Sequence, residues 1–240
     1  MQALIFDCDG VLVDTERDGH RVAFNRAFEA LGIDADWTVP LYGELLLIGG
    51  GKERMRHYFD KYGWPEGRSE SKDELIALLH KTKTDFFTDI IASGQLPLRP
   101  GIARIVDEAI AAGVRLGVCT TSAPKAIDGV LDLFGPERKA KFEFVHAGDV
   151  VSRKKPDPAI YELAKQTLGL PPEECVVIED SRNGLLAATG AGLPTLITTS
   201  AYTTDEDFTG ALDVAPELGD PPNVRVTLGD LERLVSKAAA

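Results

Sequence analysis

The chain has 240 residues, enough for one large domain or for a core domain with a smaller insertion. Its 44% hydrophobic and 27% charged content is typical of a soluble globular enzyme. With 26 basic and 38 acidic residues the net charge is −12, which argues against broad binding to nucleic acid or to anionic membranes but leaves room for a local basic pocket that binds a phosphorylated metabolite. No apolar run approaches the roughly 20 residues that would span a membrane.

The three cysteines, Cys8, Cys119 and Cys175, lie in or beside apolar β-like runs and form no C-x-x-C pair. We interpret them as small buried hydrophobic residues in a reducing compartment. The chain begins directly in a predicted core strand, so we expect it to carry no signal or transit peptide.

The first predicted strand is the apolar run "ALIF" at residues 3–6, and two carboxylates, Asp7 and Asp9, follow it. Residues two apart in a strand point the same way, and the carboxyl end of a strand is where open α/β sheets bind ligands. Two carboxylates without a positive partner would repel each other there, which would strongly raise the pKa of one of them. A bound Mg²⁺ ion removes this repulsion. A solvated turn is the alternative, because Asp and Gly both favour turns.

Residues 15 to about 95 are predicted to be helical, in stretches at 18–32, 51–63 and 72–94. A crossover between parallel strands needs only about a dozen residues, so this longer segment indicates an inserted helical domain. Within it, "IGGGKERM" places three glycines ahead of a helix, whose first backbone N–H groups can bind a phosphate. The alternative is a glycine loop with solvated charges, since the P-loop spacing is missing.

Apolar strands then alternate with helices. The strands are predicted at 114–119, 142–148, 175–180 and 194–199, and the helices at 100–113, 124–134, 156–169 and 183–192. Near-continuous apolar strands in this alternation are typical of a parallel sheet covered on both faces. The predicted fold is therefore α/β, a Rossmann-like doubly wound parallel sheet formed by residues 1–14 and 97–240, with an all-helical domain inserted at 15–96.

Polar residues also follow the later strands. Thr120, Thr121 and Ser122 lie between a strand and a helix, where hydroxyl and backbone N–H groups suit a phosphate, although Ser and Thr are also common helix caps. Lys155 is either a solvated surface charge or a positive charge on a transferring phosphoryl group. Glu179 and Asp180 form a second acidic pair at a strand end, which a solvated turn explains less well.

These motifs occur as D-x-D-G-V-L, a hydroxyl-bearing loop, K-P-D-P and E-D-S-x-x-G. In this order they resemble the haloacid dehalogenase superfamily of phosphatases over residues 3 to about 199. The helical insertion is similar to the cap domain of the branch that includes β-phosphoglucomutase and phosphoglycolate phosphatase. The stretches "DTERDGHR", "YGELLLIGGGKERM", "LHKTKT", "LPLRPGI" and "AGDVVSRKKPDPAIY" look most like plant and algal CbbY proteins.

The resemblance implies an enzyme of the chloroplast stroma that removes a phosphate from xylulose-1,5-bisphosphate, an inhibitor of Rubisco in the Calvin cycle; without that resemblance we would place it in the cytoplasm. It implies that Asp7 is the nucleophile and that Asp9 is the general acid and base. It also implies Mg²⁺ held by Asp7, the backbone carbonyl of Asp9 and Asp180, with Glu179 tuning the site from one layer further out.

The resemblance further assigns substrate contacts. Those expected at the transferring phosphoryl group are Thr120, Thr121, Ser122 and Lys155. Those expected at the rest of the substrate are Glu16, His20, Gly50, Gly51, Lys52, Lys83 and Arg99. His20 departs from the family pattern, because in β-phosphoglucomutase and bacterial CbbY proteins the histidine lies one residue closer to the nucleophile. On a regular helix this would rotate it by roughly a quarter turn.

Two other functions remain open. One is a different enzyme on the same scaffold, either a β-phosphoglucomutase-like phosphotransferase or a phosphoglycolate phosphatase, since fold does not separate them. The other is a catalytically silent metabolite sensor, against which the intact Asp7, Asp9, Lys155 and Asp180 argue. We expect a monomer whose partner is a sugar bisphosphate, with no nucleic acid and no membrane.

Overall fold

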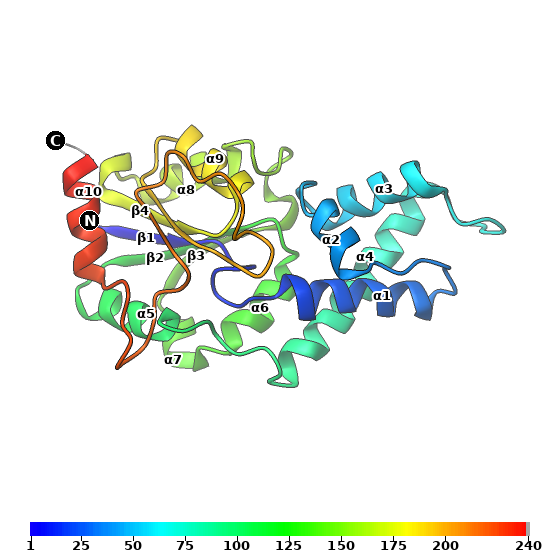
Figure 1. The fold of residues 1–240 in the computed structure, drawn as a ribbon, viewed down its shortest axis with the longest axis horizontal. Helices are drawn as coiled ribbons and strands as arrows, with labels where there is room; N and C mark the ends of the chain where they lie inside the picture. The colour runs from blue at the N-terminus through cyan, green and yellow to red at the C-terminus, as the bar shows by residue number, and fades with distance from the viewer. Residues whose placement is uncertain (239–240) are drawn as a thin grey trace.

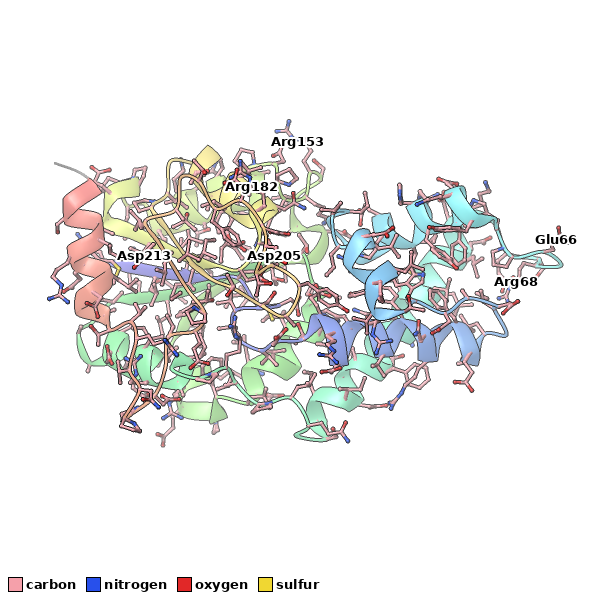
Figure 2. All side chains as sticks on the ribbon, in the orientation of Figure 1. Glu66, Arg68, Arg153, Arg182, Asp205 and Asp213 are labelled. Atoms are coloured by element: carbon pink, nitrogen blue, oxygen red, sulfur yellow. The ribbon has the colours of Figure 1, made fainter. Side chains whose placement is uncertain are left out.

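The computed structural model describes residues 1–238, which form two lobes (Figure 1). One lobe is built on a six-stranded sheet with helices on both faces, and the other contains helices only. Charged side chains cover the outside of both lobes, and Glu66 and Arg68 mark the outer end of the helical lobe (Figure 2).

All paired strands of the sheet are parallel, in the order β3-β2-β1-β4-β5-β6. Their bounds are β1 Ala3–Phe6, β2 Arg115–Thr120, β3 Phe142–Ala147, β4 Cys175–Glu179, β5 Thr195–Thr198 and β6 Asp213–Ala215. The chain runs outward from β1 to β3 and then returns to β4 on the other side of β1. This reversal is the topological switch point, where ligands bind in such sheets, and it confirms the predicted doubly wound fold.

The helices of this lobe are α5 Ile102–Ala111, α6 Pro124–Asp132, α7 Gly135–Lys139, α8 Ala159–Leu168, α9 Arg182–Gly190 and α10 Leu228–Ala238, with short 3₁₀ turns η2 Gly148–Val150 and η3 Pro172–Glu174. Alternate residues of β1 face opposite sides. Leu4 and Phe6 belong to one apolar cluster, with α5, α6 and α10. Ala3 and Ile5 belong to another, with α8 and α9.

The helical lobe contains the π-helical turn η1 Glu16–His20 and the helices α1 Arg21–Ala30, α2 Val39–Leu45, α3 Gly51–Tyr62 and α4 Lys72–Ala92. It has an apolar cluster of its own, whose buried members all come from residues 24–79. The Trp37 ring lies at its centre, 4.5 Å from the ring of Phe24 and 5.1 Å from that of Phe28. We therefore propose residues 15–96, the limits predicted from the sequence, as the inserted cap domain.

Helix α4 joins the two lobes. It begins with a capping box between Ser71 and Glu74, and its last turns place Phe87, Ile90 and Ile91 in the apolar cluster of the sheet lobe. The cap is thereby held above the carboxyl ends of the strands. Within residues 1–238, no helix combines the length and the apolar character that a membrane crossing requires.

Candidate active site

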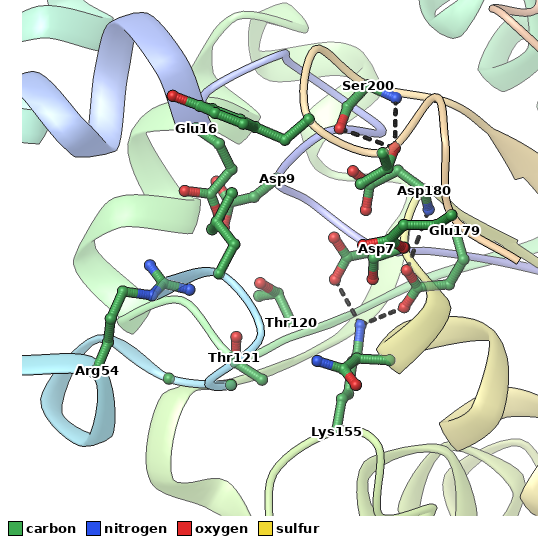
Figure 3. Close-up of a pocket in the computed structure, with 18 of the residues that line it drawn as sticks. Asp7, Asp9, Glu16, Arg54, Thr120, Thr121, Lys155, Glu179, Asp180 and Ser200 are labelled. Carbon is green, nitrogen blue, oxygen red and sulfur yellow. Dashed lines mark hydrogen bonds and ion pairs between the residues drawn. The ribbon is translucent and has the colours of Figure 1, made fainter. Parts of the chain in front are cut away.

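A cavity lies where the carboxyl ends of β1, β2 and β4 meet the cap (Figure 3). It exists because parallel strands that pair in register end together: Phe6 of β1 pairs with Val118 of β2 and Ile178 of β4. The residues that follow each strand therefore converge. The predicted site residues that line the cavity are Asp7, Asp9, Glu16, Gly50, Thr120, Thr121, Lys155, Glu179 and Asp180.

Lys155 is a buried cation between two carboxylates. Its Nζ donates to Asp7 Oδ1 at 2.6 Å, to Glu179 Oε1 at 2.5 Å and to the carbonyl oxygen of Cys119 at 2.9 Å. The Tyr161 hydroxyl also donates to Glu179 Oε1, at 2.6 Å. Lys155 is thus not a solvated surface charge, because its ammonium group is held against the predicted nucleophile.

Acidic residues outnumber basic residues in the lining of the cavity. Ligand oxygens of Asp7, Glu179 and Asp180 lie within 4.8 Å of one another, and all three side chains are buried. Burial raises the pKa of Asp7 and of Asp180, although Lys155 opposes the rise at Asp7. Gly10, at φ +84°, leaves room for Asp180, because a Cβ at position 10 would collide with that carboxylate. Crowded hard oxygen donors of this kind fit Mg²⁺.

Asp9 has different surroundings from Asp7. Its carboxylate accepts hydrogen bonds from Thr15 Oγ1 at 2.5 Å and from Ser122 Oγ, and its Oδ1 lies 2.7 Å from His20 Nε2. Burial pushes the pKa of Asp9 up, but the charge of His20 and these hydrogen bonds outweigh burial and hold the pKa below its ordinary range. One carboxylate is therefore paired with a lysine and the other with a histidine.

A π-helical turn ahead of α1 sets the direction of the His20 side chain. The carbonyl oxygen of Thr15 accepts from the N–H groups of Gly19 and His20, at 3.0 and 2.7 Å, and Arg21 N–H donates to Glu16 O. The bonds from His20 to Thr15 and from Arg21 to Glu16 each span five residues, so the turn is π-helical and wider than a regular α-helical turn. The turn is therefore not the regular helix on which the quarter-turn rotation was expected, and the imidazole of His20 reaches Asp9.

Four predicted substrate residues bond to other residues of the protein and do not line the cavity: His20, Lys83, Arg99 and Ser122. Lys83 is buried, and its Nζ lies 2.8 Å from His20 Nδ1; burial lowers its pKa to about 8. Ser122 is bonded to Asp9, as described above. Arg99 donates to the carbonyl oxygens of Thr199 and Pro216, both at 2.6 Å, and to that of Gly10. Arg99 thus holds loops together from outside the cavity.

The glycine loop is only partly in the cavity. Gly50 lines it and precedes α3 with φ +94°. Gly51 and Lys52 border a neighbouring hollow, together with His80 and Lys154. The Lys52 ammonium forms an ion pair with Asp149 of the sheet lobe, so the cap and the core are bridged there.

Sequence reasoning missed several cavity residues. One is Arg54, which lies in the stretch "IGGGKERM" but is not among the predicted substrate contacts. Four more lie in the loop after β5, Ser200, Tyr202, Thr203 and Glu206, and the rest are Gly43, Leu46, Gly49, Ser181 and Asn183. The signal for this loop was its position, because it follows the carboxyl end of a strand in the same sheet.

Comparison with known proteins defines the class. Residues 1–192, which make up most of the chain, match the family model of haloacid dehalogenase-like hydrolases. The chain belongs to this family, and the resemblance drawn from the motifs is confirmed. The protein is a phosphatase of this family, as predicted.

Its relatives narrow the class to CbbY-like proteins. A CBBY-like protein of Arabidopsis thaliana is 53% identical over 98% of this chain and 75% of its own length. Protein CbbY of Cupriavidus necator is 43% identical, covering 92% of this chain and 87% of the relative. The crystal structure of CbbY from Rhodobacter sphaeroides in complex with phosphate has a TM-score of 0.87 and 40% identity, covering 97% of this chain and 99% of that one. The crystal structure of a mutant of the same CbbY contains xylulose-(1,5)bisphosphate. That chain is 39% identical to this one, and its TM-score is 0.87.

Proposed function

We propose that this protein is a Mg²⁺-dependent phosphatase that hydrolyses xylulose-1,5-bisphosphate to xylulose 5-phosphate and phosphate through a phosphorylated Asp7. The observation that carries the proposal is the placement of two cations in one cavity. Lys155 contacts Asp7 on the core side, and Arg54 enters from the cap (Figure 3). A substrate with a phosphate at each end matches that arrangement. The bisphosphate bound by the Rhodobacter CbbY mutant supports the choice of sugar.

In the first step a carboxylate oxygen of Asp7 attacks phosphorus, and the bond from phosphorus to the sugar oxygen breaks. The leaving oxygen takes a proton from the hydrogen-bonded pair of Asp9 and His20, whose Oδ1 and Nε2 atoms are 2.7 Å apart. Lys155 offsets the negative charge of Asp7 as the phosphoryl group approaches. Thr120 and Thr121 bind the phosphoryl oxygens.

In the second step water attacks the phosphorus of the aspartyl-phosphate. Asp9 accepts the proton of this water, the bond between phosphorus and Asp7 breaks, and phosphate leaves. Two carboxylates are needed, because Asp7 carries the phosphoryl group at the time when another group must accept the proton of the water.

The residues that would hold Mg²⁺ are Asp7, Asp180 and the backbone carbonyl of Asp9, with Glu179 supporting them through Lys155. When bound, the ion supplies positive charge at the phosphoryl oxygens and relieves the crowding of buried carboxylates. The protein acts as a monomer, and its similarity to the plant relative supports a location in the chloroplast stroma.

The test is phosphate release from xylulose-1,5-bisphosphate beside ribulose-1,5-bisphosphate, phosphoglycolate and glucose 1-phosphate, with Mg²⁺ and with EDTA. We expect Mg²⁺-dependent release that is fastest from the xylulose compound. Faster release from phosphoglycolate would overturn the substrate assignment. Conversion of one hexose phosphate into another without net phosphate release would identify a phosphotransferase.

A further inference from the structure

Arg54 has an unusual electrostatic environment for a buried arginine. Its guanidinium donates to the carbonyl oxygens of Leu45 at 3.1 Å and Ile48 at 3.3 Å and to the Tyr42 hydroxyl at 3.0 Å. All of these acceptors are uncharged. Within residues 1–238 no carboxylate lies within 4.0 Å of the Arg54 guanidinium, and the side chain is 7% exposed. A buried charge without a counterion calls for an anionic ligand.

A carboxylate is nevertheless close by. Glu16 lines the same cavity as Arg54, and Figure 3 shows both side chains directed into it from separate segments of the cap. The two are joined only indirectly. The Tyr42 hydroxyl accepts from Arg54 Nη1 and donates to Glu16 Oε2 at 2.5 Å. A phenol has one proton to donate, and here it is given to the carboxylate.

The Tyr42 ring is fixed independently of this hydroxyl. It is fully buried in the aromatic cluster of the cap, with its centroid 5.7 Å from that of Trp37 and 6.2 Å from that of Phe24. The Arg54 guanidinium lies over the ring at 5.2 Å. Removal of the hydroxyl therefore leaves the ring and its packing in place.

We propose that Tyr42 is a positioning residue that keeps Glu16 and Arg54 from forming an ion pair with each other, so that Arg54 is free for the far phosphate and Glu16 for the sugar hydroxyls. The inference rests on the proposed function. Opposite charges this close form a direct charge-assisted bond when nothing separates them. Such a bond would neutralise Arg54 and turn it away from an anionic substrate.

The test is a double-mutant cycle of Tyr42→Phe and Glu16→Gln, with two phosphoryl donors. Xylulose-1,5-bisphosphate reaches the cap, whereas acetyl phosphate is small enough to occupy only the core site. For Tyr42→Phe we expect KM for the bisphosphate to rise roughly tenfold, with kcat and the hydrolysis of acetyl phosphate within about twofold of wild type. In the Glu16→Gln background the same substitution should change KM by less than about threefold, since no carboxylate remains for Arg54 to pair with.

The matched control is Tyr58→Phe. Tyr58 packs in the same aromatic cluster, 5.5 Å from Trp37 between ring centroids, and does not line the cavity. We expect its kinetics to be unchanged with both donors. Equal KM effects of Tyr42→Phe in the two backgrounds would show a merely structural role and overturn the proposal, as would an unchanged KM in the wild-type background.

The cycle remains informative if Tyr42→Phe alone does not fold, because the Glu16→Gln variant can then be compared with the double variant. A further loss of bisphosphate affinity in the double variant would overturn the proposal. Failure of the proposed function has a different signature. In that case the wild-type enzyme releases no phosphate from xylulose-1,5-bisphosphate, whatever the variants do.

Discussion

At the scale of single residues, the site depends on how tightly carboxylates are packed. Asp180 fits beside the loop after β1 only because position 10 has no Cβ. The loop also requires φ +84° there, a value that glycine adopts readily and other residues do not. Gly10 thus leaves room for Asp180, a proposed Mg²⁺ ligand, as well as forming the turn.

Gly10→Ala should separate these two roles. The new methyl group displaces the Asp180 carboxylate, so we expect the Mg²⁺ concentration for half-maximal activity to rise at least about tenfold. Gly32→Ala is the control, since Gly32 also has positive φ but nothing lies within 4 Å of its Cβ position. Both variants carry a backbone cost of about 1 kcal/mol or more, visible in thermal melting. Equal Mg²⁺ requirements in the two variants would contradict the role of Gly10 at the metal site.

At the scale of elements, the π-helical turn η1 places His20 against Asp9. The Thr15 carbonyl oxygen accepts from the N–H groups of both Gly19 and His20, and at this point the helical turn is wider than in an α-helix. Arg17 and Asp18 are the exposed members of this turn, and Asp18 is the natural residue to remove, since its side chain is the more exposed, at 66% against 57%.

Deletion of Asp18 should convert the wide turn into a regular α-helical one and leave His20 within reach of Asp9. We expect phosphate release within about fivefold of wild type, because a π-bulge differs from an α-helix by one inserted residue. His20→Ala is the reference for a lost contact. A deletion variant as slow as His20→Ala would show that the wide turn itself is required.

Helices α3 and α4 enclose a second histidine, and it makes stability depend on pH. Burial, helped by Lys83 and Lys52, lowers the pKa of His80 from its ordinary 6.5 to about 4. Between these values the unfolded chain binds a proton that the folded chain does not, so stability is lost as pH falls from 6.5 toward 4.

We expect the free energy of unfolding of wild type to fall by up to about 3 kcal/mol more than that of His80→Gln between pH 7 and pH 4.5. Urea titrations at the two pH values measure this difference. Identical losses in both proteins would show that His80 is protonated as readily in the folded state as in the unfolded one.

The strands and helices also show which parts of the fold can be predicted from the sequence and which cannot. The strands β1 to β5 were predicted because each is an apolar run, and the motif residues converge because parallel strands end together. Helix α2 was missed, since Pro40 and Gly43 favour a loop, yet Thr38 caps it and the proline lies in its first turn. Strand β6 has three residues and no periodicity to detect. Arg54 reaches the cavity only through the seating of the cap, which no local pattern contains.

At the scale of the whole molecule, the cap rests closely on the core. Lys125 of α6 pairs with Asp85 of α4 at 2.5 Å, and Asn183 Nδ2 donates to Leu47 O at 3.3 Å. Gly49 lies against the backbone of Lys155, where a Cβ would come within 2.6 Å of the carbonyl oxygen. We propose that this closure excludes water from the reaction and that the cap moves about the two segments that join it to the core, near 14–18 and 93–99.

Gly49→Ala should keep the cap from seating. We expect kcat/KM for the bisphosphate to fall at least about tenfold, because a displaced cap misplaces its substrate groups. Gly129→Ala is the control at the same interface, where a Cβ would make ordinary contacts at 3.8 Å to Ile91 and 3.9 Å to Thr88. Unchanged kinetics in Gly49→Ala would show that this contact is not needed for catalysis.

In the proposed mechanism a carboxylate oxygen of Asp7 takes the phosphoryl group. The direct measurement is mass spectrometry of enzyme quenched in acid during turnover of xylulose-1,5-bisphosphate with Mg²⁺, followed by digestion and sequencing of the peptide that contains residues 3–16. We predict the mass of one phosphoryl group on Asp7 in wild type and none in Asp7→Asn, which should also release no phosphate. Steady phosphate release by Asp7→Asn, or a phosphoryl group on another residue of wild type, would contradict the mechanism.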